Sequence, residues 1–445
     1  VTHVTGFDGR FISSQKINDK IYSGVKETFT VTLKSGRSIS ATANHPLLTT
    51  DGWRALELVQ VGETLAVPSK VPFPSQPTHM NKAELDMLAI IMAEGNTTSR
   101  CSTRFTSNES KIAETMYAAA ESLGLSVDFE KPLMRYNVTD VKELQTEQGL
   151  CNCNDVVHER GSSTVAVKTL THEDNNRSLT RQDKDHWLLR FRREHGLEGI
   201  LAKNKTMPQA VFRLSEEQLS RFLSLLWMCD GCVSASESGD VGITLESKSL
   251  AESLQHLLLR FGIMTTMCHK EATTGSETFD AWRLTVHAPS YPVFQQAVPL
   301  WGEKAENLQT LINRAEGGGS SNSNLGYPTF SDELYNEIVA IGQATDAHLA
   351  DKVCESLGWN VDAHESPSTV LHYKKTKNFD RKHLNLKGLR LWCEAAGIDA
   401  EREFGWIYDS ELYWDEVVSI TSDGLNEVYD LEIPSVHNFI ADDIV

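Results

Sequence analysis

Residues 87–95 have the sequence MLAIIMAEG, and residues 223–231 have the similar sequence LSLLWMCDG. Each stretch is apolar on nearly every side, so a helix formed from it must be buried. Each ends in an acid followed by glycine, Glu94-Gly95 in the first and Asp230-Gly231 in the second. The two stretches therefore predict a pair of buried helices, each with one carboxylate at its C-terminal end.

These stretches head an internal repeat. Residues 105–114 (FTSNESKIAE) align without gaps with residues 243–252 (ITLESKSLAE), and glycines at 124 and 262 keep the same register. Each copy predicts a strand, a loop, an amphipathic helix and a stop at glycine. The acids are 230 − 94 = 136 residues apart and the repeats 243 − 105 = 138, so we expect two similar halves about a pseudo-two-fold axis.

The paired acids predict a metal site. A carboxylate at a helix C-terminus opposes the helix dipole and costs stability unless a cation compensates. Mg²⁺ prefers such carboxylate oxygens, so Glu94 and Asp230 are candidate Mg²⁺ ligands and catalytic residues. Two symmetry-related acids also suit a DNA duplex, which has approximate two-fold symmetry. The alternative is that both acids only terminate buried helices.

The two motifs resemble those of LAGLIDADG homing endonucleases, over roughly residues 81–310. Residues 205–215 (KTMPQAVFRLS) also resemble the segment that precedes the second motif in that family. The resemblance implies an α+β two-repeat nuclease that cleaves a long, specific site in double-stranded DNA. It also implies a catalytic role for Lys205 near the scissile phosphate, and a solvated surface lysine is an equal alternative. Glu94 stands where the family usually has Asp.

The two ends of the chain carry a second pair of motifs. Residues 36–53 are GRSISATANHPLLTTDGW, and residues 428–445 are VYDLEIPSVHNFIADDIV. They resemble the conserved blocks at the two ends of an intein. The resemblance implies an all-β Hint domain built from both termini, with the endonuclease inserted between them.

The intein resemblance also implies splicing residues. Thr42 and His45 would polarise and protonate the first scissile amide, Asp430 would tune proton transfer, and His437 would assist cyclisation of a terminal Asn. Position 1 is Val, where the family has Cys or Ser, and the chain stops at Val445, where a His-Asn pair should follow. We therefore expect this stretch alone not to splice, and interpret it as a fragment of a splicing-competent parent.

Composition limits the other possibilities. The formal charge of −19 opposes simple nucleic-acid binding, although two segments are locally cationic, around residues 190–205 and 374–390. We favour a solvated surface for both segments. No long apolar run or leader occurs, so we expect no membrane span and a cytoplasmic location with reduced thiols at all eight cysteines. A zinc site at Cys151, Cys153 and His158 is not favoured, because no second ligand pair has suitable spacing. We expect Cys229 and Cys232 to pack beside Asp230.

The expected organisation has four parts: residues 1–75 and 409–445 as the Hint domain, 76–316 as the endonuclease, and 325–408 as a helical insertion. Helices near 331–342, 346–358 and 384–396 suit either a DNA-recognition module or a plain insertion. Residues 413–415 (YWD) resemble inteins lodged in replicative DNA helicases, whose flanking exteins would be the host partners. Two alternatives stay open: a self-processing element with an inactive nuclease, and a freestanding nuclease.

Overall fold

The computed structural model describes residues 3–95, 102–106, 110–130, 135–140, 187–274, 277–316, 407 and 410–445. The chain divides into two compact units. The first holds Val1–Pro72, Leu259–Thr266 and Ser321–Val445, and the second holds Phe73–Leu258 and Met267–Ser320. Apart from Ile407, the predicted helical insertion at 325–408 lies outside the described residues, and so do its basic stretch and the Cys151–His158 segment.

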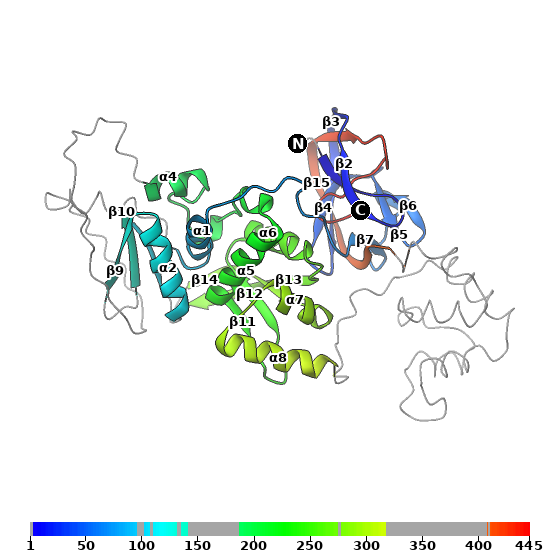
Figure 1. Ribbon diagram of the computed structural model, residues 1–445. Coiled ribbons are helices and arrows are strands. Elements are labelled where there is room, and N and C mark those ends of the chain that lie inside the picture. Colours follow the sequence, from blue (N-terminus) through cyan, green and yellow to red (C-terminus); the bar gives the residue numbers. More distant parts are fainter. Residues whose placement is uncertain are drawn as a thin grey trace, which may run out of the picture. The chain divides into compact units, whose positions relative to one another are not determined.

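The first unit is a β structure assembled from both ends of the chain (Figure 1). Six strands form one sheet in the order β4-β3-β15-β7-β5-β6, and β1 pairs with β2 in a separate hairpin. The strands are β1 (His3–Phe7), β2 (Ile12–Lys16), β3 (Asp19–Leu33), β4 (Ser38–Thr42), β5 (Pro46–Thr49), β6 (Gly52–Ala55), β7 (Thr64–Pro68) and β15 (Leu412–Glu432), with a 3-10 turn at Leu56–Leu58. The prediction that the two termini build one β-rich unit is confirmed.

Strands β3 and β15 hold that unit together. They pair antiparallel from Leu33 opposite Val417 to Asp19 opposite Glu432, with three register shifts along the way. Strand β3 has 15 residues and strand β15 has 21. Bulges increase twist and bend a strand, which allows one long strand to serve both β3 and β7.

The core of the first unit comes from alternate positions of these strands. Val31, Leu33 and Val417 are almost completely buried, and they pack with residues of β4, β5 and β7. Alternation is what the pleat requires, because successive side chains point to opposite faces of a sheet. Ile444 joins this core, so the final residues are fixed against the sheet.

The second unit contains the repeat. Its first half has α1 (Lys82–Glu94), β8 (Ser102–Thr106), α2 (Ser110–Ser122), β9 (Leu125–Glu130) and β10 (Arg135–Asp140). A connecting part has α4 (Trp187–Glu194) and 3-10 turns at Ala202–Asn204 and Val211–Arg213. The second half has α5 (Glu216–Asp230), β11 (Gly231–Val233), β12 (Val241–Leu245), α6 (Lys248–Leu259), β13 (Thr265–Thr274) and β14 (Glu277–Val286), and is followed by a 3-10 turn at Ala288–Ser290, α7 (Tyr291–Ala297) and α8 (Gly302–Glu316).

The two halves repeat the same topology. The first sheet has the order β8-β10-β9, and the second contains the equivalent order β12-β14-β13 with β11 added at the edge. Helices α2 and α6 end before Gly124 and Gly262, which both have positive φ, at 69° and 78°. The predicted α+β two-repeat architecture is therefore confirmed.

Helices α1 and α5 pack against each other at the centre of this unit. Asn81 caps the first turn of α1 and Ser215 that of α5, each accepting a backbone N–H. At the other end, a Cβ on Gly95 would lie 2.5 Å from the Ile91 carbonyl, and one on Gly231 would lie 2.2 Å from the Trp227 ring. The glycine that follows each acid is thus sterically required.

Two smaller expectations are corrected. The cationic segment at 190–205 is not simply a solvated surface, because Arg192 and Lys205 are 1% and 5% exposed and Arg193 is paired with Glu198. Cys232 does not pack inside, because alternation in β11 directs it to solvent. No helix in the described ranges combines the length and apolarity needed to cross a bilayer.

Candidate active sites

Two acids meet in the second unit, at the C-terminal ends of α1 and α5. Glu94 is the last residue of α1 and is half-buried, whereas Asp230 is the last residue of α5 and is open to solvent on one side. Helices α1 and α5 pack together, and the negative charge of Asp230 acts on Glu94, so the two carboxyl groups lie within electrostatic range of each other. The repeat thus delivers both predicted acids to one place.

The electrostatics of this place disfavour two bare negative charges. Burial raises the pKa of Glu94 to about 7, and repulsion from Asp230 adds to the effect. Burial of its carboxylate also raises the pKa of Asp230, while Lys205 and Lys304 oppose that rise. A cation that reaches both acids would therefore be bound favourably.

Lys205 is at the base of this acid pair. Its Nζ donates to the carbonyl oxygens of Ile91, Met92 and Gly95 at 3.1, 3.0 and 3.0 Å. Those carbonyls lie at the end of α1, where the helix dipole is negative, and the Ile91 carbonyl also accepts the Gly95 N–H. Burial lowers the pKa of Lys205, and the nearby carboxylates, Asp230 foremost, raise it. Lys205 therefore joins the site, with its three donors engaged by backbone.

Lys304, which the sequence did not single out, repeats this arrangement at the other helix. Its Nζ donates to the carbonyl oxygens of Trp227 and Met228 at 3.1 and 2.7 Å, near the end of α5. In the sequence, Lys304 follows the second repeat as Lys205 follows the first. This parallel position is the one sequence feature that could have identified Lys304. Each helix end therefore has a lysine that supplies part of the cationic compensation for its acid.

The acid pair fits Mg²⁺ as judged by its donors. Two carboxylates with raised pKa values face solvent, and Mg²⁺ commonly takes one or two protein carboxylates, several waters and substrate phosphates. The part of the chain that the structure describes holds no group of three or more metal-ligating side chains.

A second group of residues surrounds His45 in the first unit. Thr42 ends β4 and is nearly buried, and its carbonyl accepts the His45 N–H at 2.9 Å across the turn. The His45 carbonyl then accepts the N–H of Leu56, which fixes the loop on both sides. The sequence placed Thr42 and His45 on one loop, and the structure agrees.

The C-terminal block approaches the same histidine. The Phe439 ring meets the His45 ring edge-on with centroids 6.4 Å apart, and the charge of Asp430 acts on His45. Ser23, missed by the sequence reasoning, donates a short hydrogen bond to the Asp430 carboxylate from the neighbouring strand. His437 has a positive φ of 58°, and its backbone N–H donates to the Ile433 carbonyl at 3.2 Å. Among the described residues, no hydrogen bond, ion pair or ring contact joins its side chain to Thr42, His45 or Asp430.

The titration of His45 gives a first prediction. Burial lowers its pKa below the ordinary 6.5, and Asp430 partly opposes this. A histidine held neutral in the fold stabilises the protein above its unfolded pKa, and this stability is lost as the pH falls below 6.5. We expect an NMR midpoint for His45 below 6.5, and a still lower midpoint in Asp430→Asn. A higher midpoint in that variant would contradict the geometry.

The sequence comparisons match nearly the whole length of this chain. The family model described as intein splicing domain matches residues 5–445. The replicative DNA helicase DnaB of Rhodothermus marinus is 27% identical over 438 residues, which cover 97% of this chain and 41% of the helicase. DnaB of Synechocystis sp. is 25% identical over 453 residues, covering 98% and 44%. The chain thus spans about two-fifths of the length of these curated relatives.

Solved structures align with separate parts of the chain. A variant of the Ssp DnaB mini-intein aligns with 15% of this chain and 45% of that chain, at 32% identity and a TM-score of 0.15. The homing endonuclease I-DmoI, in complex with DNA and Mn, aligns with 49% of this chain and 97% of that chain, at 13% identity and a TM-score of 0.28.

Proposed function

The chain belongs to the intein splicing domain family, and from this we propose that its second unit is a site-specific DNA endonuclease carried by the splicing domain. The observation that carries the proposal is the meeting of Glu94 and Asp230 at the ends of two paired, repeat-related helices. Each carboxylate would take part in cleaving one strand of a DNA duplex, because the repeat and the duplex both have approximate two-fold symmetry.

Glu94 and Asp230 would hold Mg²⁺ in this proposal. When bound, Mg²⁺ polarises the phosphate, helps to activate water and stabilises the leaving oxygen. Lys205 and Lys304 fix the helix ends and reduce the negative potential that DNA phosphates would meet. This matters in a chain whose formal charge is −19. We assign Lys205 a positioning role within the catalytic group.

In this proposal, the first unit carries residues that would splice the parent protein. Thr42 and His45 would act on the first scissile peptide, with Asp430 adjusting the protonation of His45 and His437 acting at the second junction. The exteins would be the two parts of a replicative DNA helicase, since the relatives that match almost the whole chain are DnaB proteins. The DNA target would then be the helicase gene without the intervening sequence.

Plasmid cleavage tests the nuclease proposal. A supercoiled plasmid carrying the uninterrupted helicase gene should be linearised in Mg²⁺, while the same plasmid without that gene, or with EDTA present, should stay intact. Absence of cleavage with Mg²⁺ and Mn²⁺ would favour the alternative in which the second unit is an inactive passenger of the splicing domain.

Metal binding should depend on pH through Glu94. Because its pKa is about 7, the metal must displace a proton below that pH, so the apparent Mg²⁺ affinity should fall about tenfold per pH unit below 7 and level off above 8. Without metal the sign of the stability effect is opposite: the fold retains the Glu94 proton longer than the unfolded chain, so the free energy of unfolding decreases as the pH rises from about 4.5 to about 7.

Calorimetry in buffers of different ionisation enthalpy measures the released proton directly. Glu94→Gln should bind the metal more weakly and lose the pH dependence. A pH-independent affinity of the unmodified protein between 6 and 8 would contradict the assignment of Glu94 as a ligand.

A further inference from the structure

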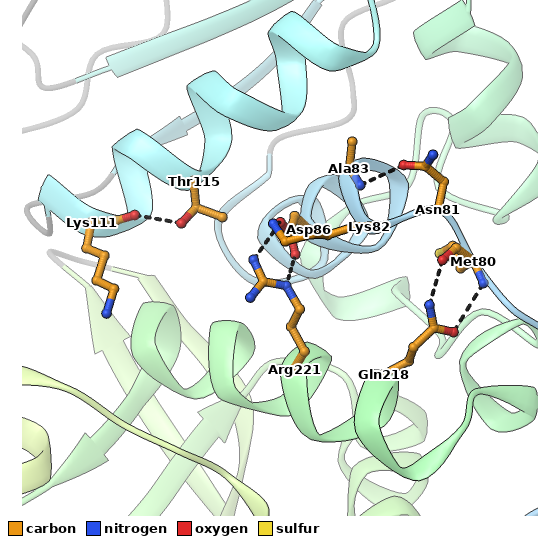
Figure 2. Close-up of polar contacts among 9 residues, drawn as sticks. All are labelled: Met80, Asn81, Lys82, Ala83, Asp86, Lys111, Thr115, Gln218 and Arg221. Carbon is orange, nitrogen blue, oxygen red and sulfur yellow. Dashed lines mark hydrogen bonds and ion pairs between the residues drawn. The ribbon is translucent and has the colours of Figure 1, made fainter.

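A polar clasp joins α5 to α1 at the ends opposite the acids. It consists of Arg221 and Gln218 on α5, and of Asp86 and the Met80 backbone on or just before α1. Figure 2 shows both side chains reaching from α5 across to the neighbouring helix. The remaining contact face of the two helices is apolar and buried, so the clasp is the directional part of the interface.

Asp86 is the centre of the clasp. Only 1% of the residue is exposed, and its carboxylate accepts from two nitrogens of the Arg221 guanidinium, with Nη2 at 2.7 Å from Oδ2. Lys82 adds a bond of 2.9 Å from the same helix, although most of that side chain is in solvent. Asp86 is buried, whereas the Arg221 side chain is 38% exposed. A bidentate Arg–carboxylate pair is strongly dependent on geometry, because both parallel bonds form only at one helix position.

Gln218 fixes the beginning of α1 in a similar way. Its side-chain amide accepts from the Met80 N–H at 3.1 Å and donates to the Met80 carbonyl at 2.6 Å. Gln218 and Arg221 are three residues apart on one face of α5, and they hold two positions of the other segment, Met80 and Asp86, that are six residues apart. A slide of α1 along α5 would break both pairs of bonds together.

The clasp does not follow the repeat. With the offset of 136 residues, the counterpart of Asp86 is Phe222 and that of Arg221 is Leu85. The same offset relates Gln218 to Lys82. The pseudo-two-fold relation therefore explains the acids but not the clasp, which is a separate feature of this interface.

We infer that this clasp is the positioning device of the acid site, setting the register of α1 on α5 so that Glu94 and Asp230 come together. Apolar side chains alone specify a register weakly, because hydrophobic attraction has no direction. Single buried polar contacts are known to fix register between helices at some cost in stability. Glu94 lies eight residues beyond Asp86, or about 12 Å along the helix, so a shift at the clasp is carried to the acid. The relevance of this inference to metal binding rests on the proposed nuclease function.

The decisive variant is Asp86→Leu with Arg221→Met, which replaces the ion pair by apolar side chains of similar size. Such replacements often leave stability equal or higher. The urea midpoint should therefore not fall, while the Mn²⁺ dissociation constant, measured by electron paramagnetic resonance at pH 8, should rise at least tenfold. Crystal structures of both proteins should show a changed separation between the Glu94 and Asp230 carboxylates.

Two single variants complete the design. Arg221→Lys keeps the charge and loses the two-pronged bond, so Mn²⁺ binding should weaken about threefold, which also tests the idea if the double variant does not fold. Arg193→Ala is the matched control, because Arg193 lies on α4 and forms an exposed ion pair with Glu198. This variant should change neither the Mn²⁺ affinity nor the carboxylate separation. Unchanged carboxylate separation and Mn²⁺ affinity in a folded clasp variant would overturn the inference.

The outcomes separate the two proposals. If the carboxylate separation changes but the unmodified protein binds no Mn²⁺, the clasp positions the acids and the metal-dependent nuclease proposal fails. If the protein binds Mn²⁺ through Glu94 and Asp230 and the clasp variants bind equally well with unaltered separation, the nuclease proposal stands and the positioning role is rejected.

Discussion

Asp230→Asn is expected to abolish double-strand cleavage while leaving the fold intact. Asn keeps the size of the side chain but removes a negative charge from the proposed metal site, and loss of one preorganised electrostatic group lowers rates by about a hundred- to a thousandfold. Burial already disfavours the charged form of Asp230, so the neutral amide should not destabilise α5. Gel analysis of plasmid cleavage should show that the linear product disappears. The only product expected is a nicked circle, formed when the Glu94 side of the site cuts one strand.

The control for this experiment is Glu252→Gln, which removes an exposed carboxylate from α6, where it pairs with Lys248. It should cleave as the unmodified protein does. Undiminished double-strand cleavage by Asp230→Asn, with the same unfolding midpoint as the parent, would reject the assignment of Asp230.

Lys205→Met is expected to lower the free energy of unfolding of the second unit by about 3 kcal/mol. The substitution removes the three hydrogen bonds that Lys205 donates to backbone carbonyls at the α1 end, and each lost hydrogen bond is worth about 1 kcal/mol. It also removes a buried cation whose charge acts on both acids, so cleavage should fall as well. Urea unfolding followed by tryptophan fluorescence measures the stability.

Lys203→Met is the matched control, because this lysine is two residues away and exposed. Its effect should be within about 0.5 kcal/mol, as is usual for surface substitutions. Lys304→Met should lie between the two, since Lys304 is only partly buried and donates to two carbonyls. A Lys205 variant as stable as the Lys203 variant would show that the hydrogen bonds of Lys205 contribute nothing to the free energy of unfolding.

The acid pair could be predicted because its signal is local and repeated. Glu94 and Asp230 each end an apolar run, and a single offset relates them, so the sequence itself pairs the helices. The bonds of Lys205 and Lys304 could not be found in this way. Their partners are backbone carbonyls 110 residues or more away for Lys205 and 76 or 77 away for Lys304, and backbone acceptors leave no pattern in side-chain identity.

The first unit shows a similar division. The turn from Thr42 to His45 is formed by neighbouring residues and follows from the local sequence. The bond from Ser23 to Asp430 joins residues 407 positions apart, and it depends on the register of β3 against β15. That register includes three irregularities, and a periodic pattern cannot reveal where a strand pair shifts.

The pairing of β3 with β15 also has a consequence for synthesis on the ribosome. The chain must add 411 − 33 = 378 residues after the end of β3 before β15 begins. At about 5–20 residues per second this takes roughly 20–75 s, during which β4 can pair with one edge of β3 and the other edge stays open. An open edge can pair with other chains, and charged residues such as Lys20 and Lys26 within β3 oppose this. The nascent protein therefore depends on these charges until its own C-terminal strand has been translated.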